Sequence, residues 1–491
     1  MSRQSAVSGL RSGRRGGLLV GLCGVLAASL LPAVLLGGGS VRAAARPPAL
    51  AKLLLSAPDL PQGWKGGNTK GTVTARIGCA SGLEGLGKGW HHSEAVFADG
   101  KGLPFVSEGL AAGPSVASTW GRLHAALATC RSATVTINGK RDRATISPLP
   151  FTVPAKAAVA SLWHLTAAGL PLGIDVVSFR VNQVLGTLSY TDVGTPDVGN
   201  AEAFVTAAIS KAGGAPGRVK GTVSIATATV HVARTREGDV GYRIVGSGPP
   251  LLLVMGYSGT MDTWDPQFVD ALAHRFTVVV FDNAGIGRTS PLPSPLTIDA
   301  MAQQTSALIA SLHLGAPPDV LGWSMGGMIA EALAVLHPTQ VDGLVLCSTF
   351  PGTGAQRPAQ SAVDALNAGG ERATSVLFPP GHQAAATVFG LAVSEYRSSA
   401  SAPTKVVAAQ AKALLQAWAD RDEALQHFRQ IVAPTLIADG TLDRLVPPEN
   451  PRHLAAGIAG ARLLLYKGAG HAFLFQKLSV FVPALESFLK G

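Results

Sequence analysis

The strongest constraint on the fold is a stretch in which glycines flank a serine, Gly322-Trp-Ser-Met-Gly326. It follows a short strand-like run, Asp319 to Gly322, and precedes a helical segment that starts at Met325. A turn this tight between a strand and a helix leaves no room for side chains beside the serine, and glycine tolerates the strained backbone that it needs. The stretch therefore predicts a turn that exposes Ser324 at one edge of a sheet.

Strand-like and helix-like segments alternate on both sides of this turn. A hairpin of Ala228 to Val232 and Val240 to Val245 opens the series, and helical segments run from Ile298 to Leu312 and onward from Met325. Alternation of this kind favours an α/β fold with a mostly parallel, doubly wound sheet and right-handed crossovers. The other expected strands are Leu251 to Val254, Phe276 to Phe281, Asp319 to Gly322, Val341 to Cys347, Pro434 to Ala438 and Ala461 to Tyr466.

The alternation stops between Phe350 and Val432, where Ala-rich helical stretches such as Lys405 to Trp418 take over. An insertion at this point is expected to form a helical cap over the ends of the strands. Its apolar side chains would favour acyl chains or other apolar substrates over charged ones. The side chains expected to face Ser324 are Phe378, Phe389, Leu391 and Trp418.

A serine hydroxyl is a weak nucleophile until a base takes its proton, so an acid and then a histidine are expected after Ser324. Gly440-Thr-Leu-Asp443 follows one predicted strand, and Gly468-Ala-Gly-His471 follows the next. Because parallel strands end at the same edge of a sheet, both side chains are expected near the serine. We predict a catalytic triad of Ser324, His471 and Asp443, with Asp439 as the nearest competitor for the acid.

Two backbone N–H groups are needed to hold the oxyanion that forms when a serine attacks a carbonyl. The amide of Met325, directly after the nucleophile, is one expected donor. The other is expected from the glycine-rich loop Met255 to Gly259, and we predict the amide of Tyr257. A plain structural turn is the alternative interpretation of this loop.

The motifs GWSMGG, GTLD and GAGH, in this order, resemble the α/β-hydrolase superfamily, within its esterase, lipase and cofactor-free haloperoxidase-like branch. The resemblance covers roughly residues 228 to 491 and implies no cofactor and no metal. Met255 stands where many members have histidine, and Ala284 stands where arginine is frequent, which leaves the subfamily and substrate open. A serine at position 324 argues against epoxide hydrolases and haloalkane dehalogenases, which use aspartate there.

The chain of 491 residues is long enough for more than one folded unit. A linker is expected at residues 215–227, after Gly213-Gly-Ala-Pro-Gly217, and it separates the hydrolase-like part at 228–491 from a smaller α+β domain at 46–214. The opening LLLSAPDLPQGW and the later VSFRVNQVLGTLSYTDVG resemble extracellular sensor-like domains of actinobacterial kinases and lipoproteins. This resemblance implies a ligand-binding or scaffolding domain with a disulfide. The domain is expected to be noncatalytic, because its His, Cys and carboxylate residues do not fall at catalytic or metal-ligand spacing.

Residues 1–45 have the layout of a secretory signal. Arginines, including the pair Arg14 and Arg15, precede the apolar run Leu18 to Leu36, and small residues follow it around Ala43. The expected location is therefore secreted or extracytoplasmic. An uncleaved anchor in the membrane or cell envelope is the alternative, because the run approaches the length of about 20 residues that spans a bilayer.

Three cysteines follow the signal segment. Cys79 and Cys130 fall in the same predicted domain, and export to an oxidising compartment favours a disulfide between them. Two free, buried thiols are the alternative. Cys347 ends a predicted strand and is expected to be a buried thiol.

Composition limits the classes of function. With 47% hydrophobic and 14% charged residues the chain is expected to fold into packed domains. The net charge of +10 is not arranged as a basic stripe with aromatics, so nucleic acid is not an expected partner.

We expect a carboxylic-ester hydrolase acting on small apolar esters, of unknown oligomeric state. The alternatives are a perhydrolase or haloperoxidase, a C–C hydrolase, and a cell-surface binding protein with a vestigial hydrolase unit.

Overall fold

The structure is a computed structural model in which the chain divides into two compact units, residues 1–221 and 222–491. Among the described residues, no helix has the length and apolar character needed to cross a membrane. The predicted signal at 1–45, Cys79 and residues 215–223 of the predicted linker lie outside them. The described residues are 48–60, 64–66, 73–76, 90–98, 104–113, 116–137, 140–149, 159–167, 170–194, 196, 198–213, 224–394, 396 and 401–489.

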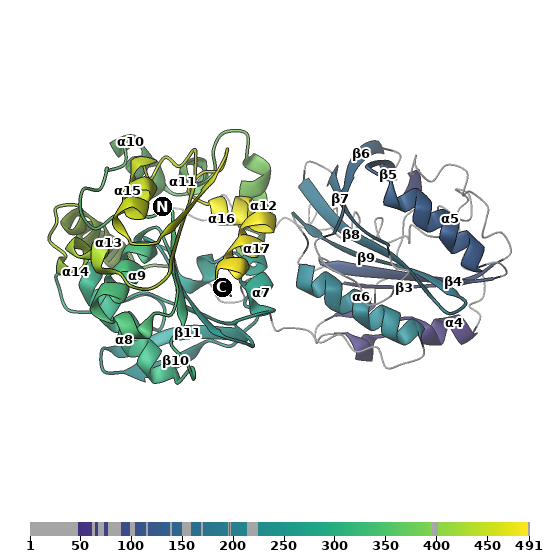
Figure 1. The fold of residues 1–491 in the computed structure, drawn as a ribbon, viewed down its shortest axis with the longest axis horizontal. Helices are drawn as coiled ribbons and strands as arrows, with labels where there is room; N and C mark the ends of the chain where they lie inside the picture. The colour runs from purple at the N-terminus through teal and green to yellow at the C-terminus, as the bar shows by residue number, and fades with distance from the viewer. Residues whose placement is uncertain are drawn as a thin grey trace. The chain divides into compact units, whose positions relative to one another are not determined.

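The described part of the first unit is built on a nine-stranded sheet in the order β1-β3-β4-β9-β8-β7-β6-β5-β2. Each strand pairs antiparallel with its neighbours, which confirms the α+β prediction. Helices α4 (Pro48–Leu53) and α6 (Val198–Ala212) share one apolar core with the sheet, and α5 (Val116–Ala128) lies on the other side (Figure 1). The strands are β1 (Lys65–Gly66), β2 (Val73–Arg76), β3 (His91–Ala98), β4 (Phe105–Ala112), β5 (Ser132–Ile137), β6 (Lys140–Ser147), β7 (Val159–Ala167), β8 (Leu170–Val181) and β9 (Val184–Val193).

The second unit contains an eight-stranded sheet in the order β10-β11-β13-β12-β14-β15-β16-β17. The first two strands are antiparallel to their neighbours, and the pairs from β13 to β17 are parallel, as the alternation of strands and helices predicts. The strands are β10 (His231–Thr235), β11 (Gly238–Gly246), β12 (Pro250–Val254), β13 (Thr277–Phe281), β14 (Asp319–Trp323), β15 (Leu344–Cys347), β16 (Thr435–Gly440) and β17 (Arg462–Tyr466).

Helices cover both faces of this sheet (Figure 1). Alternate residues of one strand enter separate cores, as the two-residue period of a strand requires. Leu252 and Val254 belong to the core beneath α8 (Ile298–Leu312) and α9 (Met325–Leu336). Leu251 and Leu253 belong to the core beneath α7 (Pro266–Ala273) and α17 (Leu478–Leu489).

The predicted hairpin is present, but the predicted start of its first strand at Ala228 is wrong, because β10 begins only at His231. The preceding residues form a turn in which the amide of Ala228 donates to the carbonyl of Ser224. Ile225 is fully buried, and its amide donates to the Asp270 carboxylate on α7 at 2.7 Å. Burial beneath a helix therefore overrides the strand propensity of this segment.

A group of helices lies between β15 and β16, the position at which the sequence predicts a cap. Short helices α14 (Glu423–Gln426), α15 (Glu449–Gly457) and α16 (Phe473–Gln476) flank the last strands. Between β15 and α14 the chain forms α10 (Gln360–Ala368), α11 (Gly370–Leu377), α12 (Gln383–Val393) and α13 (Thr404–Ala417).

Candidate active site

Ser324 stands at the turn between β14 and α9 with a backbone conformation of φ 59° and ψ −123°. A positive φ is unusual for a residue with a side chain, and it marks local strain. Ser324 is partly exposed, whereas Trp323 and Met325 beside it are buried. The turn thus raises the serine side chain out of the core, as a nucleophile requires.

The glycines around Ser324 have no room for a side chain. A Cβ on Gly322 would lie 2.2 Å from the carbonyl oxygen of Gly326, and one on Gly326 would lie 2.0 Å from that of Val254. A Cβ on Gly327 would meet Thr349 at 2.5 Å. Each distance is a steric overlap, so the G-x-S-x-G-G spacing is dictated by close packing of α9 against β12 and β15.

Asp443 and His471 are hydrogen-bonded in a buried pair. His471 Nδ1 lies 2.8 Å from Asp443 Oδ2, and their side chains are 3% and 1% exposed. The other carboxylate oxygen accepts hydrogen bonds from the amides of Leu445 at 2.7 Å and Val446 at 2.9 Å. Asp443 is therefore held by its own turn after β16 and aims at the imidazole that follows β17.

Asp439, the competing acid, lies within β16 and is 1% exposed. Its Oδ1 accepts hydrogen bonds from Ser348 Oγ and from the amide of Gly440, each at 2.7 Å. Burial and the neighbouring Asp443 carboxylate raise the pKa of Asp439 well above its usual range. Asp443, and not Asp439, bonds the imidazole of His471.

His471 lies beside the residue that precedes the serine. Trp323 Nε1 donates to the carbonyl oxygen of His471 at 3.0 Å, and the two rings are 5.6 Å apart. Among the described hydrogen bonds none joins Ser324 to His471. Such contacts are often long in free enzymes and shorten when substrate binds. Ser324 and His471 thus lie at the same edge of the sheet, and Trp323 links the turn of the first to the loop of the second.

The loop that begins at Met255 approaches the serine closely. A Cβ on Gly256 would lie 3.0 Å from Ser324 Cβ and 3.7 Å from the Met325 amide nitrogen. Met325 is the first residue of α9, so its N–H has no carbonyl partner within the helix. The amide of Tyr257 follows directly after Gly256. The two predicted oxyanion donors therefore lie on segments that converge at Ser324.

Residues of the cap and of the sheet fix this loop. The amide of Ser258 donates to Gln410 Oε1 of α13 at 2.9 Å, and Tyr257 Oη donates to Asn367 Oδ1 of α10 at 3.0 Å. From the other side, Asn283 Nδ2 donates to the carbonyl oxygen of Met255 at 2.8 Å. The position of the loop consequently depends on the cap.

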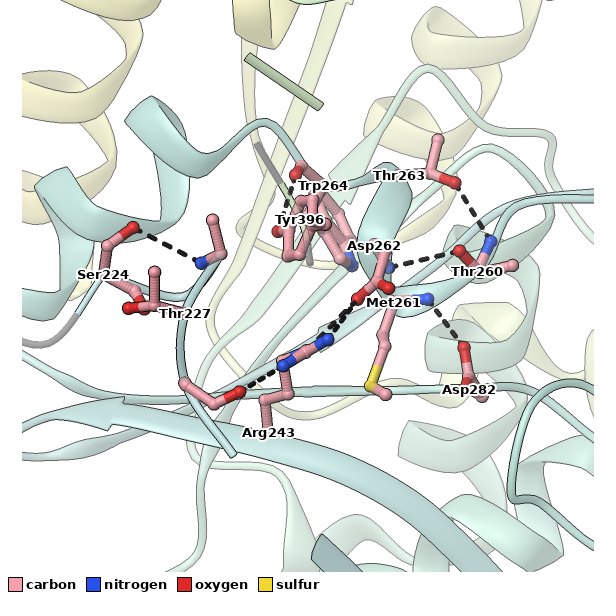
Figure 2. Close-up of polar contacts among 12 residues, drawn as sticks. Ser224, Thr227, Arg243, Thr260, Met261, Asp262, Thr263, Trp264, Asp282 and Tyr396 are labelled. Atoms are coloured by element: carbon pink, nitrogen blue, oxygen red, sulfur yellow. Dashed lines mark hydrogen bonds and ion pairs between the residues drawn. The ribbon is translucent and has the colours of Figure 1, made fainter. Parts of the chain in front are cut away.

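A buried polar cluster anchors the segment that follows the loop (Figure 2). Arg243 Nη2 lies 3.1 Å from Asp262 Oδ1, and both side chains are 4% exposed. The same guanidinium also donates to the carbonyl oxygen of Ala228. The amide of Met261 donates to Asp282 Oδ1 at 2.7 Å, and burial raises the pKa of Asp282 to about 6. Tyr396 Oη, beyond α12, donates to the carbonyl oxygen of Trp264 at 2.8 Å.

Aromatic rings connect the cap to His471. Phe378 contacts Phe389 on α12 at a centroid distance of 5.6 Å, and Phe389 stacks on Phe475 at 5.0 Å. Phe475 in turn makes a T-shaped contact with Trp323 at a centroid distance of 5.3 Å. Trp418 packs elsewhere, against Phe350 at 5.2 Å. The side chain of Leu391 lies outside the described ones.

Sequence reasoning missed several of these partners. Trp323 occupies the variable position of the motif, and Gln410 and Asn367 bond the loop from far along the chain, so no local pattern marks them. Within the described part of the chain, no group of His, Cys, Asp and Glu is arranged to hold a metal ion.

Comparison with known proteins places this site in a family. Residues 249–478 match the family described as alpha/beta hydrolase fold. "Putative carbamate hydrolase RutD" of Caulobacter sp. (strain K31) is 30% identical over 263 residues, which cover 51% of this chain and 96% of that protein. "Putative non-heme bromoperoxidase BpoC" of Mycobacterium tuberculosis (strain CDC 1551 / Oshkosh) is 28% identical over 266 residues, covering 51% and 97%. An alpha/beta hydrolase fold protein from Chitinophaga pinensis has a TM-score of 0.47 at 22% identity, covering 54% and 99%.

Proposed function

The chain belongs to the alpha/beta hydrolase family through its C-terminal unit, and on that premise we propose that it cleaves carboxylic esters through an acyl-enzyme on Ser324. The observation that carries the proposal is the buried hydrogen bond between His471 and Asp443, at the sheet edge where Ser324 takes its strained conformation. Because the Asp443 carboxylate accepts a hydrogen bond from Nδ1–H of His471, the proton stays on Nδ1 and Nε2 is the basic nitrogen of the imidazole.

In the first half of the reaction, His471 takes the hydroxyl proton of Ser324 while the oxygen attacks the ester carbonyl. The amides of Tyr257 and Met325 stabilise the negative charge on the carbonyl oxygen, and the positive end of α9 adds to this effect. The C–O bond to the alcohol then breaks, and the protonated imidazole returns the proton to the leaving oxygen. Water repeats the cycle on the acyl-enzyme and releases the acid.

We propose an apolar acyl group as the preferred substrate portion. The aromatic series from Phe378 through Phe389 and Phe475 to Trp323 supports this choice, because it runs from the cap to the residue beside His471. Apolar side chains close to the reacting groups favour apolar ligands over charged ones. If trimming or exchanging residues 350–432 left the chain-length preference unchanged, the cap would not select the substrate.

A fluorophosphonate probe followed by a panel of p-nitrophenyl esters tests the reaction. The probe is expected to label the wild-type chain at Ser324 and to leave Ser324→Ala unlabelled. Carbamates belong in the same panel, because one relative is named a carbamate hydrolase. A chain that is labelled at Ser324 but cleaves only carbamates would overturn the assignment of esters as substrates. It would still support Ser324 as the nucleophile.

Perhydrolysis is the second candidate, favoured by the relative named as a bromoperoxidase. Here hydrogen peroxide in place of water attacks the acyl-enzyme, releasing a peracid and the free serine. The peracid then oxidises bromide, so no metal or cofactor takes part. Bromination of a dye in acetate buffer with hydrogen peroxide, compared between wild type and Ser324→Ala, measures this activity.

We also propose that the protein is exported, on the strength of Arg14, Arg15 and the apolar run Leu18 to Leu36. Cell fractionation with N-terminal sequencing tests this. A mature chain starting near Ala45 outside the membrane supports a cleaved signal, and an intact membrane-bound chain supports an anchor. An intact chain in the cytoplasm would contradict export.

A further inference from the structure

Two carboxyl groups stand at the catalytic end of β16, and the proposed mechanism uses only Asp443. The second, Asp439, has one oxygen satisfied by Ser348 and by the amide of Gly440. Its Oδ2 is buried and receives no hydrogen bond from an N–H or O–H group of the described residues. An ionised carboxylate oxygen in this position would be costly, since burial without a donor destabilises the charged form.

The neighbouring carboxyl, Asp443, has the opposite surroundings. Three donors point at it, namely His471 Nδ1 and the amides of Leu445 and Val446. Donors of this kind favour a negative charge. Asp439 and Asp443 are close enough to interact through a side-chain hydrogen bond. Two carboxyl groups this close favour sharing one proton, and the difference in donors assigns the charge to Asp443.

Two further titratable side chains near Asp439, Cys347 and Tyr466, are held toward their neutral forms. Burial raises the pKa of the Cys347 thiol well above its usual range, and burial raises the pKa of Tyr466 to about 12. For Asp439, burial has the largest effect on the pKa and Asp443 the next, and both raise it. The hydrogen bonds from Ser348 and Gly440 lower the pKa but do not outweigh these two effects.

We propose that Asp439 is a positioning residue for the reaction, which keeps a proton on Oδ2 and donates it as a hydrogen bond to the Asp443 carboxylate. The proton stays on Asp439 throughout the cycle. A short O–H···O⁻ hydrogen bond is stronger than a neutral one, so it holds Asp443 in the orientation that His471 needs. This inference rests on the proposed function, because it assumes that Asp443 and His471 serve Ser324.

The test is the rate of fluorophosphonate labelling of the full chain as a function of pH, which requires no knowledge of the substrate. In Asp439→Asn the amide NH₂ replaces the O–H donor, and the amide oxygen still accepts from Ser348 and Gly440. We expect labelling within about threefold of wild type and a midpoint of the acidic limb within about 0.3 pH units. Asp439→Leu removes the donor and is expected to label about 10- to 100-fold more slowly.

If Asp439 were ionised, the Asn variant would remove a negative charge near the imidazole, and the midpoint would fall by about one pH unit or more. That shift would overturn the proposal even if Asp439→Leu failed to fold. Equal rates for folded Leu and Asn variants would overturn it as well. Exposed Asp420→Asn serves as the matched control. Ser324→Ala is labelled in parallel: label on it would refute the proposed function, whereas an unlabelled Ser324→Ala with a shifted Asn profile refutes the Asp439 inference alone.

Discussion

The indole nitrogen of Trp323 donates a hydrogen bond to the backbone carbonyl of His471, 3.0 Å away and 148 residues further along the chain. Trp323, the residue before the proposed nucleophile Ser324, is therefore bonded to the loop that carries the proposed base His471. Trp323 is 5% exposed and also packs against Phe475. One side chain thus links the turn that carries Ser324 to the loop that carries His471.

Trp323→Phe is expected to lower kcat on a short p-nitrophenyl ester about tenfold, because it leaves the His471 carbonyl without its donor while keeping an aromatic ring. KM is expected to change less, since the variant alters the placement of the base. Trp418→Phe, which keeps the contact with Phe350, is the control. An unchanged kcat in Trp323→Phe would show that the hydrogen bond does not position His471.

Gln410→Met is expected to lower kcat about 10- to 100-fold, because the loop of residues 255–259, which carries the proposed oxyanion donor Tyr257, loses the partner of the Ser258 amide. Ser258 has φ 59°, so its backbone needs external support to stay in place. Steady-state kinetics on the same ester measures the effect. Lys412→Met, on an exposed position of the same helix, controls for changes in α13. Equal losses of kcat in both variants would show that the effect comes from a change in α13 and not from the contact with Ser258.

Arg243→Met is expected to destabilise the second unit by about 3–5 kcal/mol, because it leaves the buried Asp262 carboxylate without its cation. The change also removes the contact of the guanidinium with the Tyr396 ring at 5.5 Å. Urea unfolding, with hydrogen exchange of peptides from β11 as the readout, measures the loss of stability in the second unit. Adding Asp262→Asn should recover part of it. A double variant as unstable as the sum of both single variants would exclude coupling between the two residues.

Asp319 makes the stability of the second unit depend on pH. Burial and the nearby Asp342 raise the pKa of Asp319 from 3.8 to about 7. Between these values the folded state binds a proton that the unfolded state has lost, so stability falls as pH rises from about 4 to about 7. Asp319→Asn should therefore stabilise the unit by about 1–3 kcal/mol at pH 8 and by less at pH 5. The same gain at both pH values in urea unfolding would exclude this titration.

The sequence predicted the local part of the site and not its distant partners. The order of Ser324, Asp443 and His471 could be predicted because each follows a strand of a parallel sheet, and such strands end together. Gly322 and Gly326 could be predicted because tight packing permits no side chain there. The partners Trp323 and Gln410 could not, because contacts across about 150 residues depend on the packed fold and leave no period in the sequence.

The choice between the two acids shows where the sequence prediction stopped. Asp439 and Asp443 both follow an apolar run, and spacing alone leaves either within reach of a histidine. Hydrogen bonds distinguish them: Asp439 is bonded to Ser348 of the neighbouring strand end, and Asp443 is bonded to His471. The pairing of Cys79 with Cys130 stays a prediction, because Cys79 lies outside the described residues.

The last prediction concerns Ser324, His471 and Asp443 as one catalytic unit. Ser324→Ala and His471→Ala should each remove most of the esterase activity, by about 10⁴-fold or more, and the double variant should lose little beyond that, because neither residue works without the other. Asp443→Asn should lose an equal or smaller amount, since the amide disturbs the tautomer of the imidazole. Rates on a short p-nitrophenyl ester, with circular dichroism to confirm folding, measure these effects. Wild-type turnover in Ser324→Ala would refute the mechanism, and an active Asp443→Asn beside an inactive Asp439→Asn would assign the acid to Asp439.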